Sequence, residues 1–69
     1  MSEVKVGDVR RTEKGIIYII TRISFNTADA IHQYGGVYWA FNVDYFAKDK
    51  LLAHYDTWKD AVNSKEFNE

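Results

Sequence analysis

The most strongly apolar stretch of the chain is the run IIYIITRI at residues 16–23. β-Branched and aromatic side chains dominate it, and they favour extended backbone. In a strand, alternate residues share a face: Ile17, Ile19, Thr21, Ile23 and Phe25 on one side, and Ile16, Tyr18 and Ile20 on the other. Because both faces are apolar, the run predicts a central strand that is covered on both sides.

Shorter segments around this run predict further strands. Residues 8–12 (DVRRT) predict a short edge strand, and Lys14-Gly15 predicts the turn that follows it, since glycine accepts the positive φ of a tight turn. After a loop at 25–27, residues 28–34 (ADAIHQY) predict another strand, although their alanines also suit a helix. Gly35-Gly36 indicates a hairpin turn.

Residues 37–46 (VYWAFNVDYF) alternate regularly and predict a strand with one buried face. We expect the core face to carry Val37, Trp39, Phe41, Val43 and Tyr45, and the outer face Tyr38, Ala40, Asn42 and Asp44. Residues 47–50 then predict a polar turn, and residues 51–55 a short last strand.

The C-terminal region predicts a helix. Thr57 and Asp60 have the three-residue spacing of a capping box, and the acid also suits the helix dipole. Trp58, Ala61 and Val62 form a narrow apolar stripe. Asn63-Ser64 is expected to end the helix, since Asn tolerates the left-handed conformation, and Phe67 then folds back toward the core.

Together these elements predict one small α+β domain over residues 1–69. It would have four or five short antiparallel strands, joined sequentially as a meander, and one C-terminal helix. We expect the sheet to be curled or closed into an SH3-like barrel, with an open α+β sheet as the alternative. The chain has no cysteine, which excludes disulfides and cysteine-ligated zinc as sources of stability.

Charge and hydropathy narrow the function classes. The net charge is −1, so no global field favours a polyanion, and we expect DNA and RNA to bind weakly at physiological salt. Residues 4–22 are nevertheless locally basic, and residues 44–69 locally acidic. No apolar run approaches the roughly 20 residues that cross a bilayer. We therefore expect a cytoplasmic protein with no membrane partner.

Residues suited to catalysis are few and widely spaced. The chain has no phosphate-binding glycine motif and no serine nucleophile motif. Its two histidines, His32 and His54, have no metal-ligand spacing with Asp44 or Asp56. Asp44 and Asp49 bracket a predicted surface turn, where solvated carboxylates are the simpler interpretation. The sequence predicts no enzyme, no catalytic residue, no cofactor and no metal.

Aromatic content is the more informative feature, with two Trp, five Tyr and four Phe in 69 residues. Trp39, Phe41 and Trp58 have core spacing, whereas Tyr34 and Tyr38 flank the double-glycine turn. Aromatics exposed there could anchor a protein interface, stack on single-stranded bases, or pack under the helix. The leading hypothesis is a non-enzymatic protein-interaction module that binds a protein partner or its own copies.

Basic residues near the N-terminus could contribute to binding either a protein or a nucleic acid. On an edge strand, Arg10-Arg11 would block sheet aggregation, but the same edge can also accept a partner peptide. The expected partner-binding residues are therefore Arg10, Arg11, Tyr34 and Tyr38. The alternative is a small nucleic-acid-binding barrel that uses Lys5, Arg10, Arg11, Lys14 and Arg22.

The C-terminal stretch HYDTWKDAVNSKEF, residues 54–67, resembles the tail of many short proteins encoded by phages and prophages of Gram-positive bacteria. The pieces Val6-Gly7-Asp8-Val9, Lys14-Gly15 and Tyr18-Ile19-Ile20-Thr21 are similar to their opening strand, turn and strand. The resemblance implies a viral accessory protein in the host cytoplasm, of a kind that often binds and inhibits host proteins. It implies no particular functional residue.

Overall fold

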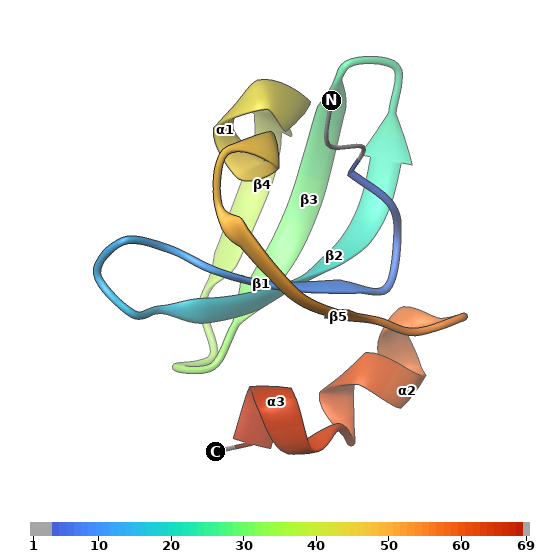
Figure 1. Ribbon diagram of the computed structural model, residues 1–69. Helices are drawn as coiled ribbons and strands as arrows, with labels where there is room; N and C mark the ends of the chain where they lie inside the picture. Colours follow the sequence, from blue (N-terminus) through green and yellow to red (C-terminus); the bar gives the residue numbers. More distant parts are fainter. Residues whose placement is uncertain (1–3, 69) are drawn as a thin grey trace.

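Figure 1 shows a small α+β domain in which short helices lie around a bent antiparallel sheet. This computed structural model describes residues 4–68; the ends of the expected domain, residues 1–3 and 69, lie outside the described part. The strands are β1 (Asp8–Arg11), β2 (Ile17–Ser24), β3 (Thr27–His32), β4 (Val37–Asn42) and β5 (Lys50–His54). The helices are α1 (Val43–Ala47), α2 (Trp58–Val62) and α3 (Lys65–Asn68).

The sheet has the strand order β4-β3-β2-β1-β5, and every neighbouring pair is antiparallel. The predicted meander is thus correct for β1 to β4, and β5 returns to pair with β1. This return makes the expectation of an edge strand at residues 8–12 wrong, because β1 lies between β2 and β5. The edges of the sheet are β4 and β5.

The sheet bends along β2, so that β1 and β5 cross β3 and β4 at a steep angle (Figure 1). The β2–β3 register shifts between Ile20 and Arg22, and such a bulge bends and twists a strand. Only residues 43–49 connect β4 with β5, so the chain has little length with which to pass from one sheet edge to the other. The paired strands nevertheless form an open sheet over residues 4–68, with no β4–β5 pairing.

Two apolar clusters lie on opposite faces of β2, which confirms that this strand is central and covered on both sides. On one face Tyr18 and Ile20 pack with Ala28, Ala30 and Phe46. On the other face Ile19 packs with Val9 and Ala61.

The bulge changes which face the second half of β2 presents. Ile23 packs with the cluster of Tyr18, not with Ile19 as strict alternation predicted. Phe25 is fully exposed, because it occupies the β2–β3 turn with a φ of 54°. Side-chain alternation therefore holds only up to the bulge.

The predicted strand over residues 37–46 is shorter than expected, and its faces are reversed. Asn42 caps α1 by accepting a hydrogen bond from the Asp44 backbone N–H, so the chain turns helical at Val43. Of the expected core residues only Val43 packs against the core, while Val37, Trp39, Phe41 and Tyr45 are exposed. Tyr38 packs on Tyr18 instead.

A second bulge accounts for part of this reversal. Ala40 has a φ of 51°, and the β3–β4 register shifts between Ala28 and Ala30. Strict alternation cannot continue through such a position. Phe41 thereby comes to lie on the same side as Tyr38, at 5.4 Å between ring centroids, rather than with Trp39.

The C-terminal region follows the prediction more closely. Thr57 is the N-cap of α2 and its side chain accepts a hydrogen bond from the Asp60 N–H, as the capping spacing indicated. The helix ends at Asn63, and a separate α3 begins at Lys65. Trp58 and Phe67 then pack against the same cluster of Val9 and Ile19. One C-terminal helix was expected, and the structure has two short ones.

Candidate functional site

A buried ion pair lies at the start of β1. Asp8 and Arg10 are 2% and 1% exposed, and the Arg10 guanidinium donates to the Asp8 carboxylate at 3.2 and 3.3 Å. The same carboxylate accepts the Lys5 backbone N–H at 3.0 Å and contacts His54 Nδ1 at 2.7 Å. Burying charge is costly unless the charged groups are paired and hydrogen-bonded, and these are.

Arg10 also joins β1 to the segment that follows α1. It donates to the backbone carbonyls of Phe46 at 3.1 Å and Asp49 at 3.0 Å. The Asp49 carboxylate in turn accepts the Tyr18 hydroxyl at 2.6 Å. Throughout residues 4–68, no buried side-chain nitrogen or oxygen lacks a hydrogen-bond partner. The network therefore fixes the α1–β5 connection against the sheet.

The two histidines lie in different surroundings. His54 contacts Asp8, while His32 contacts Tyr34 and Tyr38. Over the described residues no group of three or more His, Asp or Glu side chains is arranged to hold a metal ion.

Tyr18 gives the network a measurable pH dependence. Burial raises the pKa of its phenol, and the hydrogen bond to Asp49 and that carboxylate's charge raise the pKa further. The folded protein therefore keeps a proton that the unfolded chain loses above pH about 10, so stability falls as pH rises past that value.

We expect Tyr18→Phe to be less stable than the parent at pH 7, by about 1 kcal/mol for the lost hydrogen bond. Above pH about 10 this gap should close by roughly 1.4 kcal/mol per pH unit, because phenylalanine has no proton to lose. Urea unfolding of both proteins between pH 7 and 11.5 measures this difference in the free energy of unfolding. A gap that stays constant over this range would show that Tyr18 does not hold its proton as the structure implies.

A strip of aromatic rings runs from the β3–β4 hairpin to α1. We call it the aromatic strip; its members are His32, Tyr34, Tyr38, Phe41 and Tyr45. Successive ring centroids along it are 5.3 to 6.1 Å apart. Phe46 supports the strip from the core, through contacts with Tyr38 and Phe41. Tyr34 is 75% exposed and Tyr45 59%, so the two ends of the strip face solvent.

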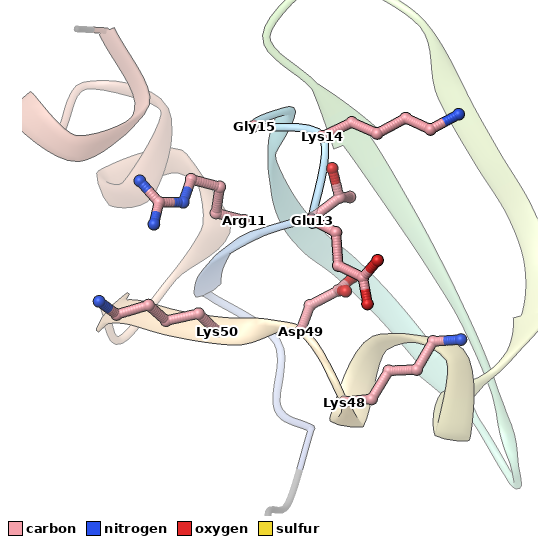
Figure 2. A pocket seen from close by; sticks show the side chains of 8 residues that line it. Arg11, Glu13, Lys14, Gly15, Lys48, Asp49 and Lys50 are labelled. Atoms are coloured by element: carbon pink, nitrogen blue, oxygen red, sulfur yellow. The ribbon is translucent and has the colours of Figure 1, made fainter.

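Beside the strip lies a hollow between the β1–β2 turn and the α1–β5 connection. We call this hollow, of about 400 Å³, the basic hollow (Figure 2). Figure 2 shows Arg11 and Lys50 pointing to one side and Lys14 and Lys48 to the other, with the Glu13 and Asp49 carboxylates between them.

The basic hollow has a local excess of positive charge. Four cations and two carboxylates line it, whereas the rest of the sequence has five basic and eight acidic residues. Arg11 and Lys50 are direct cross-strand partners, and like charges in that position are destabilising. Lys14 and Lys48 also line a neighbouring hollow with Tyr38 and Tyr45, and the Lys48 ammonium lies 5.6 Å from the Tyr45 ring centroid. The strip and the basic hollow thus form one continuous surface.

The structure separates the predicted partner-binding residues. Tyr34 and Tyr38 belong to the strip, and Arg11 lines the basic hollow. Arg10 is buried in the ion-pair network, so its expected role at a binding surface is wrong for the folded protein. Sequence reasoning missed Phe41 and Tyr45, which it assigned to the core, and Lys48 and Lys50, which it placed in a plain polar turn.

The set expected for nucleic acid does not form one surface either. Arg10 is buried, Lys14 borders the strip, and Arg22 lines a different hollow, next to Trp39. The tyrosines on either side of Gly35-Gly36, which the sequence singled out, both belong to the strip.

Comparisons with known proteins add no family assignment. No protein-family model matches the sequence, and neither the curated proteins nor the solved structures give a match. Over the described residues, no helix is long and apolar enough to span a membrane. Inferences about function therefore rest on the surface itself.

Proposed function

We propose that this chain is a non-enzymatic protein-interaction module whose contact surface is the aromatic strip with the adjoining basic hollow. The observation that carries the proposal is the exposure of Tyr34, Phe41 and Tyr45 in one row of rings, the middle of which packs on the buried Phe46. Aromatic side chains held in place bury much apolar area at little entropic cost, which is why they dominate interface energetics. Contiguous exposed apolar surface of this kind marks interaction sites.

The proposed partner is a protein with an acidic contact surface. Its acidic groups would lie over Lys14 and Lys48, beside the rings of Tyr38 and Tyr45. Arg11 and Lys50 would extend the contact at the far side of the basic hollow. Charges at the rim of an interface mainly steer association, so binding should weaken as salt is raised.

The fold we propose is an SH3-like meander, with α1 connecting the fourth and fifth strands. The short 43–49 connection and the bend in β2 support it, since both bring the two sheet edges toward each other. We further propose a phage-encoded accessory protein that acts in the bacterial cytoplasm on a host or viral protein, for example by inhibiting a host factor. The resemblance of residues 54–67 to phage protein tails supports this part of the proposal.

The test is capture of partners from a Gram-positive bacterial lysate by the tagged protein, with and without nuclease. We expect a partner that survives nuclease, and that the double variant Tyr34→Ala, Tyr45→Ala captures at least about 30-fold less, as for loss of interface anchors worth 2 kcal/mol or more. Phe25→Asn is the matched control, because Phe25 is a fully exposed aromatic outside the strip.

Three outcomes would contradict the proposal. Capture that nuclease abolishes would favour the nucleic-acid alternative. Equal capture by the strip variant and the parent would show that the contact surface lies outside the aromatic strip. Sedimentation equilibrium of the purified protein is the third measurement: a dimer that the strip variant dissociates would make a second copy of the chain, rather than an acidic protein, the occupant of the surface.

A further inference from the structure

A second hollow lies on β2, β3 and β4 and shares no residue with the aromatic strip or the basic hollow. Its volume is about 280 Å³, and Arg22, Ser24, Thr27, Asp29, Trp39 and Ala40 line it. Trp39 is 70% exposed, although it is one of the two largest apolar side chains in the chain. An indole left open beside polar groups suits a ligand that is itself flat and polar.

The β4 bulge shapes this hollow. The Asp29 carboxylate accepts the Ala40 backbone N–H at 2.7 Å through Oδ1, and Ala40 has a φ of 51°. Asp29 therefore holds the strand in the conformation that places Trp39 and Ala40 at the hollow. Its second oxygen, Oδ2, makes no hydrogen bond within residues 4–68 and can accept from a ligand.

Arg22 supplies a cation to the same hollow. Arg22 and Asp29 are cross-strand partners, yet over the described residues Arg22 forms no ion pair with a carboxylate. A guanidinium that lines a polar hollow without a carboxylate partner is suited to an anion, and to phosphate oxygens in particular.

We propose that this hollow binds a single nucleotide, with the base stacked on Trp39, its N–H donors on Asp29 and its phosphate on Arg22. Proteins recognise unpaired bases in this way, by stacking on aromatic rings and hydrogen bonding to the base edge. Guanine presents an imino N–H and an amino group side by side, and either group can donate to Asp29 Oδ2. We therefore expect guanine to bind best, and uracil, with its single N–H between carbonyl oxygens, worst.

The size and charge of the hollow favour one nucleotide over a strand. Its volume lies near the lower end of the range of about 300–1,000 Å³ for small-molecule sites. Among the residues that the structure describes, Arg22 is the only cation that lines it, so the hollow offers one guanidinium to one phosphate group. A protein of net charge −1 also has no excess field to attract a polyanion.

The experiment is a titration of the full chain with GMP, CMP, AMP and UMP, followed by quenching of tryptophan fluorescence. We expect saturable quenching with GMP binding tightest. Trp39→Ala should weaken GMP binding, measured by calorimetry, about tenfold or more, as loss of one stacking platform does. Arg22→Gln should weaken it by a similar factor and remove most of its salt dependence.

Matched controls keep the result specific. Arg11→Gln removes an exposed arginine elsewhere, and Tyr34→Ala removes an exposed ring from the aromatic strip. Both should bind GMP as the parent does. Circular dichroism and a melting curve confirm that each variant is folded.

A second arm separates the free nucleotide from a nucleotide within a strand. It compares GMP with a thymidine decamer that has one central guanine, and with the all-thymidine decamer. If the guanine decamer binds more tightly than GMP and Trp39→Ala loses this binding, the site is retained, and its ligand is a nucleotide within a strand. Lack of quenching by both GMP and the decamers at millimolar concentration would overturn the proposal, as would GMP binding that Trp39→Ala leaves unchanged.

Discussion

Replacing Asp8 with alanine is expected to remove most of the protein's free energy of unfolding at room temperature. The change removes the Asp8 carboxylate from beside the buried Arg10 guanidinium, whose bonds to the Phe46 and Asp49 carbonyls remain. Breaking a buried ion pair by removing one partner costs about 3–5 kcal/mol. That loss is comparable with the whole stability of a small domain, which is about 5 kcal/mol at the low end.

Urea unfolding measures this loss, with Glu13→Ala as the control because Glu13 is an exposed carboxylate on the adjacent turn. The control should stay within about 0.5 kcal/mol of the parent. If Asp8→Ala melts within a few degrees of the parent, the pair contributes little and Arg10 must find another partner in the variant.

The double variant Asp8→Leu, Arg10→Met tests whether the loss comes from an uncompensated charge. Replacing both members of a buried pair with apolar residues is often neutral or stabilising. Here Phe46 and Asp49 would lose a donor to their carbonyls, so we expect partial recovery. The losses in the free energy of unfolding caused by Asp8→Leu alone and by Arg10→Met alone should therefore add up to more than the loss in the double variant, by about 1–3 kcal/mol.

The sequence predicted the central strand and the C-terminal helix because their signals are local. The apolar run in β2 needs cover on both faces wherever it lies in the sheet. The bond between Thr57 and Asp60 spans three residues and depends on nothing distant. Both features survive any arrangement of the remaining strands.

The faces of β4 could not be predicted from alternation, because both sets of alternate residues include aromatic side chains. Tyr38 is as able as Trp39 to pack in a core when its hydroxyl remains accessible. The bulge at Ala40 gives no local signal either, since alanine is an unusual residue at positive φ. Asp29, eleven residues earlier, holds this conformation.

The sequence does contain a local signal for the buried ion-pair network. Asp8 and Arg10 are two residues apart on a strand, which places opposite charges on the same face. Such a pair can neutralise itself inside a fold. The partners that complete it, at Phe46, Asp49 and His54, are more than thirty residues away and follow from the return of β5 to β1.

The surface proposed for partner binding was predictable only in part. Tyr34 and Tyr38 were identified through the glycine turn that they flank. Phe41 joins them because the bulge at Ala40 turns it to the side of Tyr38. Tyr45 lies in α1, which begins at Val43 where a continued strand had been expected, and its ring contacts Phe41. The aromatic strip therefore depends on the bulge at Ala40 and on the cap at Asn42, and simple alternation predicts neither.

Replacing Gly7 with alanine is expected to destabilise the protein by about 3 kcal/mol or more, from backbone strain and overpacking together. Gly7 is buried with a φ of 93°, and a Cβ there would lie 2.1 Å from the Tyr55 carbonyl oxygen. The backbone cannot move away without cost, because the Gly7 N–H donates to the Ile20 carbonyl and the Gly7 carbonyl accepts from the Tyr55 N–H.

Gly15→Ala is the matched control: the φ of Gly15 is 89°, but a Cβ there meets open space. That variant has only the conformational strain, of about 1–2 kcal/mol. Thermal and urea unfolding of both variants measure the difference, and equal losses would show that β1 and the segment after β5 are not packed as closely as the structure has them.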